Sequence, residues 1–209
     1  DKRIRLVVNR FNIGLTKSLN KGLNLAKGEL IARIDADDIC NQKRLEIQYK
    51  FFQDNPIYSL LGSNFIFKKN NERIENNYPL IHNHDDIKEI LKYKNIYCHS
   101  TIMFVKKDVF EIGLYNPIFK YAQDYDLWLR FSEKYKCAYI KDNLVECELG
   151  ENSISSRFVI QQKAYSILAR LKAMQRTSKK QSYFLPIILS IVKYPKAIFW
   201  LFKNKDLFK

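Results

Sequence analysis

The 209-residue chain has little glycine and proline, and its cysteines form no recognisable motif. Only 6 glycines and 5 prolines occur, which excludes the collagen-like and the Pro/Gly-rich disordered classes. The four cysteines, Cys40, Cys98, Cys137 and Cys147, include no C-x-x-C pair. The pattern therefore predicts neither a zinc ribbon nor a thioredoxin-like redox site, and it favours a reducing compartment.

Acidic residues are scarce relative to basic ones. There are 22 Asp and Glu against 36 Lys and Arg, which gives a formal net charge of +14. Such a charge predicts an anionic partner, which can be nucleic acid, a nucleotide or an anionic membrane face. The hydrophobic content of 46% indicates a globular chain with one main domain. The chain opens on Asp1 without a charged and then apolar leader, and we expect a fragment of a longer protein.

A long uninterrupted apolar run is also missing. A membrane-spanning helix needs about 20 such residues, and the apolar tail from Tyr183 to Lys209 is interrupted by Pro186, Lys193, Pro195 and Lys196. Its aromatic residues between lysines suit a segment lying on anionic lipid. A helical hairpin packed on the main domain explains the same pattern. The sequence leaves both interpretations open.

Three carboxylates follow an apolar segment of strand character. The stretch Glu29 to Asp35 is predicted as a strand, and it ends in Asp35, Asp37 and Asp38. Alternate side chains of an extended backbone share a face, so Asp35 and Asp37 project together. Paired carboxylates are typical ligands of Mg²⁺ or Mn²⁺, which keep open positions for phosphate oxygens. Turn formation or helix capping is the simpler explanation of the same residues.

The segments before this cluster predict a β-α-β unit. Arg3 to Asn9 alternates as a strand does, and Thr16 to Lys27 has helical spacing of its apolar residues, with Thr16 as N-cap and Gly28 after the last turn. Two strands joined by such a helix predict a mostly parallel sheet, in which ligands bind at the carboxyl ends of the strands.

Periodicity predicts several further elements. In the helix expected over Asn41 to Asp54, Leu45, Tyr49 and Phe52 would form the apolar side. The other expected strands cover 57–67 and 100–105. Four other helices are expected: one over 85–93, a short one that ends near residue 113, one that ends at about residue 135, and one over 158–174.

A second dense motif runs from Phe119 to Arg130 and opens one of these helices. Residues two apart on a helix point in roughly opposite directions, so Asp124 and Asp126 cannot both face one cleft. Only one of them can be catalytic. The alternative is that Asp124 is a first-turn acid stabilised by the helix dipole. For Trp128 we favour a place in the core.

Together these motifs resemble family 2 glycosyltransferases of the GT-A fold. The matching segments, in order over about residues 3 to 160, are Asn12-x-Gly14-Leu15, Asn20-x-Gly22, Ala26-Lys27-Gly28-Glu29, Asp35-Ala36-Asp37-Asp38, Arg44-Leu45-Glu46-x-Gln48, His99 before Ile102-Met103-Phe104, Gly113-x-Tyr115 and Gln123-Asp124-Tyr125-Asp126-Leu127-Trp128-Leu129-Arg130. The resemblance implies an α/β, GT-A-like fold over 1–150, with a helical, basic and apolar appendage over 151–209.

The resemblance also implies an activity and its residues. Family 2 enzymes transfer a sugar from a nucleotide diphosphate donor to an acceptor hydroxyl, usually with inversion, and we expect a glycan or lipid-linked acceptor in surface polysaccharide synthesis. By position, Asp37 resembles the principal Mn²⁺ or Mg²⁺ ligand, Asp35 contacts the ribose or assists the metal, and Asp38 supports both. Asp124 resembles the catalytic base.

The remaining assignments rest on the same resemblance. Asn12 and Gly14 fall in the loop near the nucleotide, and His99 is a candidate near donor or acceptor. Gln123 stands where the family usually has Glu, so one charge is missing beside the proposed base. The family's first strand and its Asp-Asp-Gly-Ser-like turn are absent, which implies an N-terminally truncated domain that is inactive alone.

Two other function classes are weighed against this one. A metal-dependent aspartyl phosphohydrolase would use Asp35 as nucleophile at the end of a parallel strand. A basic fragment binding membrane or nucleic acid would explain the net charge, but the alternation of aromatic and basic residues typical of single-strand binders is missing. We therefore expect no nucleic-acid partner, and a cytoplasmic protein with peripheral contact at the cytoplasmic face of an anionic membrane.

Overall fold

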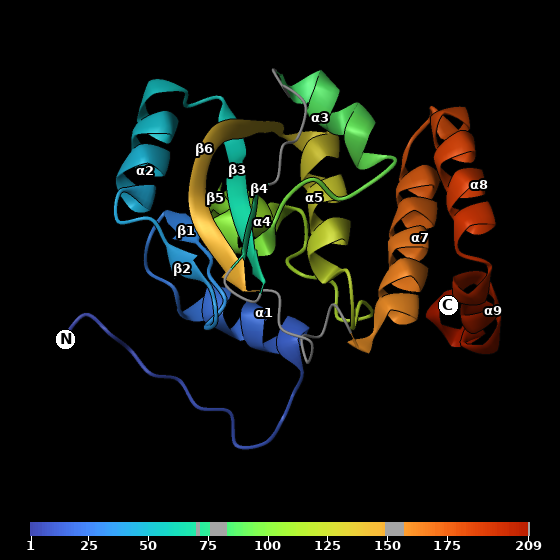
Figure 1. Cartoon of the computed structure of the whole chain (residues 1–209), viewed down its shortest axis with the longest axis horizontal. Helices are drawn as coiled ribbons and strands as arrows, with labels where there is room; N and C mark the ends of the chain where they lie inside the picture. The colour runs from blue at the N-terminus through green and yellow to red at the C-terminus, as the bar shows by residue number, and fades with distance from the viewer. Residues whose placement is uncertain (70–71, 76–82, 149–156, 209) are drawn as a thin grey trace.

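A computed structural model describes residues 1–69, 72–75, 83–148 and 157–208 of the chain. It is an α/β structure in which one curled sheet is covered by helices (Figure 1). The helices α1, α2 and α5 lie around the sheet, and α7, α8 and α9 form a further layer beside α5 at one end of the molecule.

The sheet has the strand order β1-β5-β3-β6-β2, with β4 paired to β3. These strands are β1 (Leu30–Ala32), β2 (Ile39–Cys40), β3 (Tyr58–Lys69), β4 (Glu72–Glu75), β5 (Met103–Val105) and β6 (Lys136–Glu148). Among the described pairings only β3 and β6 run parallel. The strands expected around residues 30, 60 and 103 are confirmed, whereas the expectation of a mostly parallel sheet is wrong for these pairings.

The first fourteen residues form no strand. The segment Arg3 to Asn9 is irregular, and Ile4, Leu6 and Val8 on it are 74–85% exposed. An alternating pattern becomes a strand only where a neighbouring strand can accept its backbone hydrogen bonds, and no described strand pairs with this segment. The predicted N-terminal strand, and with it the β-α-β unit, is therefore wrong.

The predicted helices are confirmed with shifted ends. They are α1 (Leu15–Leu25), α2 (Arg44–Asp54), α3 (His84–Leu91), α4 (Lys106–Glu111), α5 (Gln123–Lys134) and α7 (Val159–Arg176). Thr16 is not the N-cap of α1, because Gly14 holds that place with φ 82° and the Thr16 hydroxyl donates to the carbonyl of Phe119 at 2.8 Å. The C-cap of α1 is Ala26 rather than Gly28.

Helix α2 buries its polar side. Arg44 and Gln48 are 1% and 0% exposed, while Leu45 and Tyr49 are 58% and 53% exposed. The predicted apolar side is thus wrong for Leu45 and Tyr49, and right for Phe52, which is 8% exposed. The reason lies outside the helix, since the buried polar groups bind backbone carbonyls of distant loops, as described below.

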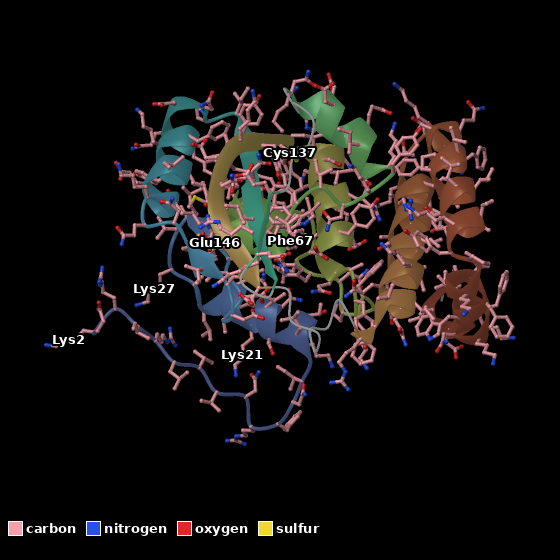
Figure 2. The ribbon with its side chains drawn as sticks, in the orientation of Figure 1. Lys2, Lys21, Lys27, Phe67, Cys137 and Glu146 are labelled. Carbon is pink, nitrogen blue, oxygen red and sulfur yellow. The ribbon has the colours of Figure 1, made fainter. Side chains whose placement is uncertain are left out.

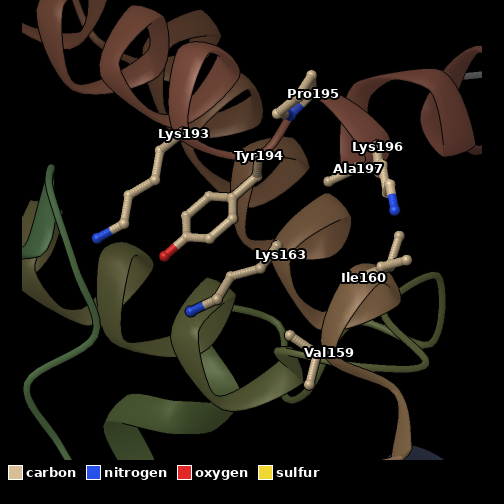
Figure 3. Close-up of a pocket in the computed structure, with 8 residues that line it drawn as sticks. All are labelled: Val159, Ile160, Lys163, Lys193, Tyr194, Pro195, Lys196 and Ala197. Atoms are coloured by element: carbon tan, nitrogen blue, oxygen red, sulfur yellow. The ribbon is translucent and has the colours of Figure 1, made fainter.

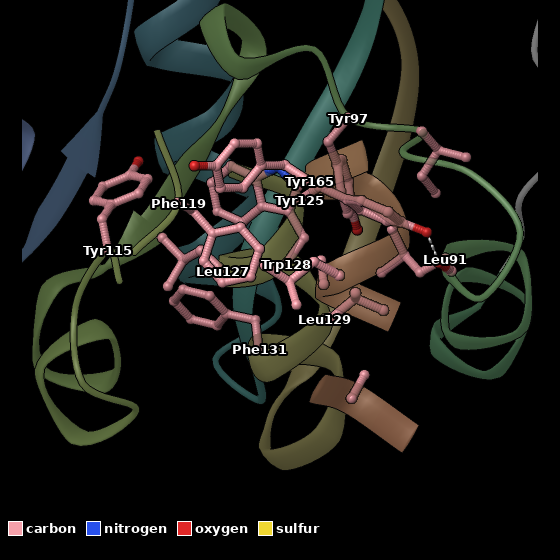
Figure 4. Packing of buried hydrophobic residues seen from close by; sticks show 14 of the residues in the cluster. Leu91, Tyr97, Tyr115, Phe119, Tyr125, Leu127, Trp128, Leu129, Phe131 and Tyr165 are labelled. Atoms are coloured by element: carbon pink, nitrogen blue, oxygen red, sulfur yellow. Dashed lines mark hydrogen bonds between the residues drawn. The ribbon is translucent and has the colours of Figure 1, made fainter. Parts of the chain in front are cut away.

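The main core lies between the sheet, α3, α5 and α7. Leu127, Trp128 and Phe131 of α5 are fully buried in it (Figure 4), which confirms the core assignment of Trp128. The hydroxyl of Tyr125 donates to the carbonyl of Leu91 and joins α5 to α3. Cys137 on β6 is buried inside the same core, whereas Lys2, Lys21 and Lys27 extend outward near the N-terminus (Figure 2).

The C-terminal part is helical and continues this core. Helix α7 contacts α5 on one side, and α8 (Phe184–Lys193) and α9 (Pro195–Lys203) on the other. Short 3-10 turns, η2 (Lys180–Tyr183) and η3 (Lys205–Phe208), flank this pair. In the described residues no single helix is long and apolar enough to span a bilayer; 180–193 and 195–203 together reach the required length and composition, but they are bent by 98°.

Candidate functional site

The acidic cluster forms a tight turn after β1. The backbone of Arg33 continues the strand by donating to the carbonyl of Ile102 at 3.1 Å, and the amide of Asp38 then donates to the carbonyl of Asp35 at 3.3 Å. The next residues form β2, which pairs with β6. The carboxylates therefore sit on a turn that is held on both sides by strands of the sheet.

Asp35 is held in place by two side chains. Arg33 forms an ion pair with its carboxylate. The buried hydroxyl of Ser100 accepts hydrogen bonds from the Asp35 amide and from Arg33 Nη1, each at 3.0 Å. Ser100 also lies 3.4 Å from Asp35 Oδ2. One carboxylate of the cluster is thus already neutralised and fixed by the protein.

Asp37 and Asp38 differ from Asp35. Asp37 is exposed, and within the described residues its carboxylate makes no hydrogen bond or ion pair. Burial raises the pKa of Asp38, the charges of Asp35 and Asp37 raise it further, and a hydrogen bond with Ser100 lowers it. Carboxylates that repel one another in this way would be stabilised by a bound cation.

Arg44 and Gln48 of α2 hold the loops around this turn. Arg44 Nη2 donates to the carbonyls of Arg33 at 2.8 Å and Ile102 at 3.1 Å, and Nε donates to Gln48 Oε1 at 3.1 Å. Gln48 Nε2 donates to the carbonyl of Thr101 at 2.7 Å. A buried guanidinium is tolerated because carbonyl oxygens satisfy its donors.

The second carboxylate lies in the first turn of α5. Asp124 is half-buried, and Asn95 Nδ2 donates to its Oδ2 at 2.8 Å. Burial raises the pKa of Asp124, while hydrogen bonds from the backbone of Tyr125 and from Asn95 lower it. The helix begins after Ala122, whose φ of 53° is left-handed. The carboxylate is therefore partly desolvated and held in one position.

Asp126 faces the other side of α5, as the helical spacing predicts. Its buried carboxylate forms an ion pair with Arg130 at 2.8 Å. Arg130 also donates to the carbonyls of Ile112 at 2.6 Å and Leu114 at 2.7 Å. Asp126 therefore serves the packing of α5, and Asp124 is the acid of this motif that is available for chemistry.

Tyr115, His99 and Arg33 connect the two carboxylate sites. His99 Nε2 and the Tyr115 hydroxyl are 2.7 Å apart. Burial raises the pKa of Tyr115, and the negative charges of Asp124 and Asp35 both raise it further. The guanidinium of Arg33 lowers the pKa of Asp124. Burial, together with Arg33, lowers the pKa of His99.

The predicted site residues Asn12 and Gly14 lie at the start of α1. Asn12 Oδ1 accepts a hydrogen bond from the amide of Gly14 at 2.9 Å at the start of α1. In the part of the chain that the structure describes, no contact joins either residue to the carboxylates. Asn20 Nδ2 of α1 donates to the carbonyl of Tyr115 at 2.8 Å, and Asn20 Oδ1 accepts from the amide of Tyr115 at 3.0 Å, which ties this helix to the loop before α5. Gln123 is buried beside Asp124.

The acidic turn fits a cation with few protein ligands. The described residues contain no group of three or more His, Cys, Asp or Glu arranged to hold a metal ion. Two neighbouring carboxylates, Asp37 and Asp38, are nevertheless free of the Arg33 ion pair. Mg²⁺ and Mn²⁺ sites of this sparse kind complete their coordination with water and substrate phosphates.

Four residues of the site were missed by sequence reasoning: Arg33, Asn95, Ser100 and Tyr115. Arg33 gave one usable signal, because a charged residue inside an apolar strand next to acids indicates an ion pair. Ser100 and Asn95 gave none, since their partners are 65 and 29 residues away in the sequence.

Comparisons with known proteins give a consistent result. The model of the family "Glycosyl transferase family 2" matches residues 1–113. The chain is similar to the O-antigen biosynthesis glycosyltransferase WbnJ of Escherichia coli, with 37% identity over 72% of this chain and 57% of that protein. More generally, the chain spans about half the length of the curated relatives it matches.

Two solved structures share the fold. Staphylococcus aureus TarS bound to UDP-GlcNAc has a TM-score of 0.62 at 13% identity, over 83% of this chain and 51% of that one. The mannosyltransferase PcManGT of Pyrobaculum calidifontis, bound to GDP-Man and Mn²⁺, has a TM-score of 0.57 at 16% identity, over 97% of this chain and 57% of that one. The expected GT-A-like α/β fold is thereby confirmed.

Proposed function

Because the chain belongs to glycosyl transferase family 2, we propose that it moves a sugar from a nucleotide diphosphate donor to an acceptor hydroxyl. One arrangement carries the proposal: Ser100 binds the Asp35 amide at 3.0 Å, and its neighbour His99 lies 2.7 Å from the hydroxyl of Tyr115. The charges of Asp35 and Asp124 both raise the pKa of this tyrosine, in addition to the larger effect of burial. A transferase needs these two functions close together, one for the leaving diphosphate and one for the attacking hydroxyl.

On the donor side, the acidic turn would hold the diphosphate through a divalent ion. Asp37, with help from Asp38, would bind Mn²⁺ or Mg²⁺, and the ion would neutralise charge on the departing diphosphate. Asp35, fixed by Arg33 and Ser100, is suited to accept a hydrogen bond from the ribose. Asn12 and Gly14 are proposed to line the nucleotide side, and His99 the sugar side.

On the acceptor side, Asp124 would take the proton from the attacking hydroxyl. Its desolvation makes the carboxylate a stronger base than an exposed Asp, and general base catalysis contributes about 10²–10⁴-fold to the rate. Asn95 fixes its orientation. Attack from the face opposite the diphosphate would invert the anomeric carbon. Gln123 supplies no second charge beside this base.

The acceptor is proposed to be a glycan or a lipid-linked glycan of surface polysaccharide synthesis. WbnJ is named for O-antigen biosynthesis, which supports this class of acceptor. A lipid-linked acceptor would place the protein in the cytoplasm, at the cytoplasmic face of the membrane. The division into a catalytic part over 1–150 and an appendage over 151–209 belongs to the same proposal.

The proposal is tested first by donor binding. Titration calorimetry of a full-length version that includes the family's first strands, with UDP- and GDP-sugars, should show binding with Mn²⁺ and much weaker binding with EDTA. Asp37→Asn should weaken the Mn²⁺-dependent binding, whereas Asp54→Asn, an exposed acid on α2, should not. Unchanged metal dependence in Asp37→Asn would remove Asp37 from its role.

Turnover of the same full-length version then separates transfer from hydrolysis. Release of nucleoside diphosphate that depends on added acceptor is the expected result. Hydrolysis of simple phosphate monoesters without an acceptor would contradict it and indicate a phosphohydrolase.

A further inference from the structure

The outer faces of α8 and α9 are apolar. Eight large hydrophobic side chains on these two short helices are 38–74% exposed: Phe184, Leu185, Ile188, Leu189, Ile191, Val192, Phe199 and Phe202. We call this set the outer apolar face. Both helices lie at the outermost edge of the molecule, on the far side of α7 from the sheet (Figure 1). A helix exposed only to water would present polar residues here.

The inner face of α8 explains why this surface is turned outward. Ser190 is buried, and its hydroxyl donates to the carbonyl of Pro186 at 3.0 Å. Arg170 of α7 donates to the same carbonyl at 3.3 Å and to that of Tyr93 at 3.1 Å. Ala197 and Leu201 of α9 are also buried. The pair is therefore anchored to the core by its inner side, and it needs no rearrangement to present the outer apolar face.

The charge around this face is mainly positive. Residues 152–205 contain 11 Lys and Arg and no Asp or Glu, and Asp206 follows them. Lys193, Lys196, Lys203 and Lys205 follow the apolar residues directly, at the bend and at the end of α9. An apolar surface bordered mainly by cations complements an anionic lipid surface, in which acyl chains lie beneath phosphates.

A pocket at the bend between α8 and α9 combines both features. Its volume is about 300 Å³, and Val159, Ile160, Pro195 and Ala197 supply apolar walls (Figure 3). Three lysines border it: Lys163, Lys193 and Lys196. The ammonium groups of Lys163 and Lys193 lie 5.0 and 5.6 Å from the ring centroid of Tyr194. Three cations beside an apolar cavity suit a phosphate group attached to a hydrocarbon chain.

We propose that α8 and α9 dock the protein on an anionic phospholipid bilayer. The outer apolar face inserts among the acyl chains near the headgroups, to a depth of about 5–10 Å, and Lys163, Lys193 and Lys196 bind lipid phosphates at the bend. This inference gives the proposed peripheral location a defined surface. It stands apart from catalysis, because bilayer binding requires neither donor nor metal.

The test is vesicle sedimentation of the 209-residue chain. Vesicles of phosphatidylcholine with about one third phosphatidylglycerol are compared with pure phosphatidylcholine, at low and high salt. We expect binding to the anionic vesicles that weakens in 1 M salt, where electrostatic attraction is screened beyond about 3 Å. Absence of binding to anionic vesicles would overturn the proposal, even if donor binding were intact.

Two double variants separate the contributions. Lys193→Gln with Lys196→Gln should weaken binding to anionic vesicles about 25-fold, since each basic residue at such a surface contributes about fivefold. Leu189→Ser with Val192→Ser should weaken it at least about tenfold through lost apolar burial. The matched controls are Lys17→Gln with Lys141→Gln, and Leu45→Ser with Ile57→Ser, which alter exposed residues of the same types elsewhere.

The remaining outcomes are also decisive. Equal loss of binding in the control variants would mean that the surface is not specific, and it would overturn the proposal. If Leu189→Ser with Val192→Ser converts a dimer to a monomer in sedimentation velocity while vesicle binding is absent, a second copy covers the face instead. Should the double variant fail to fold by circular dichroism, Val192→Ser alone, at a position 74% exposed, carries the same test.

Discussion

Asn95 donates a hydrogen bond from Nδ2 to Oδ2 of Asp124 at 2.8 Å, and this bond joins the segment after α3 to the first turn of α5. The bond stabilises the charged carboxylate and so lowers the pKa of Asp124, against the effect of burial. Asn95 therefore influences both the orientation and the basicity of the proposed catalytic base.

Asn95→Ala should change the pH dependence of turnover. Without the hydrogen bond, the pKa of Asp124 rises, so the base is protonated at higher pH. The acid limb of kcat/KM should shift to higher pH. Asn24→Ala, an exposed amide on α1, is the control and should leave the profile in place. A uniform loss of rate at every pH would show a structural role only.

Asp124→Asn should reduce turnover about 10²–10⁴-fold and leave donor binding intact. The variant should also alter stability in a pH-dependent way. The folded-state pKa of Asp124 is raised above its ordinary value of 3.8. Asp124 therefore contributes fully to the free energy of unfolding below pH 3.8, and this contribution is lost as the pH rises through the folded-state pKa. Because Asn does not ionise, the free energy of unfolding of the variant rises relative to that of the wild type as the pH increases between those two pKa values.

The stability part is measured by thermal unfolding at pH 4 and pH 7.5. The melting temperature of Asp124→Asn relative to the wild type should be higher at pH 7.5 than at pH 4. The opposite trend would mean that the Asp124 carboxylate is stabilised by its surroundings and is not held as a desolvated base.

Ser100→Ala should weaken donor binding about tenfold. The hydroxyl accepts hydrogen bonds from the Asp35 amide and Arg33. A buried N–H group that loses its hydrogen-bond acceptor costs about 1–3 kcal/mol. Loss of the hydroxyl also raises the pKa of Asp38, so the weakening should increase toward acid pH. Calorimetry at pH 6 and pH 8 measures both effects, with Ser182→Ala near α8 as the control.

Arg130→Met should lower the free energy of unfolding by about 3–5 kcal/mol, because the buried Asp126 carboxyl would lose its ion-pair partner. Urea unfolding measures the change. Lys50→Met breaks an exposed ion pair with Asp54 and should cost at most about 1 kcal/mol. The double change Asp126→Leu with Arg130→Met should recover part of the loss; purely additive losses would contradict a specific ion pair.

Sequence periodicity predicted the helices well, because their apolar residues face a core on one side. Leu23 of α1 and Leu127 of α5 are buried as their spacing requires. The pattern failed on α2, where Arg44 and Gln48 are buried because carbonyls of Arg33, Thr101 and Ile102 satisfy them. Such partners are distant in the sequence, and no local pattern reveals them.

Strands were harder to predict than helices. The 13-residue strand β6 was not predicted, because the polar residues from Lys141 to Asn143 interrupt the alternation of apolar residues along it. Arg3 to Asn9 had the alternation but not a partner strand. The position of the acidic turn and of Asp124 was predictable from short motifs, whereas Ser100 and Tyr115, which join them, became visible only in three dimensions.

The acidic turn lies between β1 and β2, and the partners of these two strands come late in the chain. Leu30 pairs with Val105, and Cys40 pairs with Val145. During translation the carboxylates therefore leave the ribosome long before the segments that shape their turn. Closure of such long loops is slow. A nascent chain halted before residue 145 would lack the pairing of β2 with β6, and we expect its acidic turn to bind neither metal nor nucleotide.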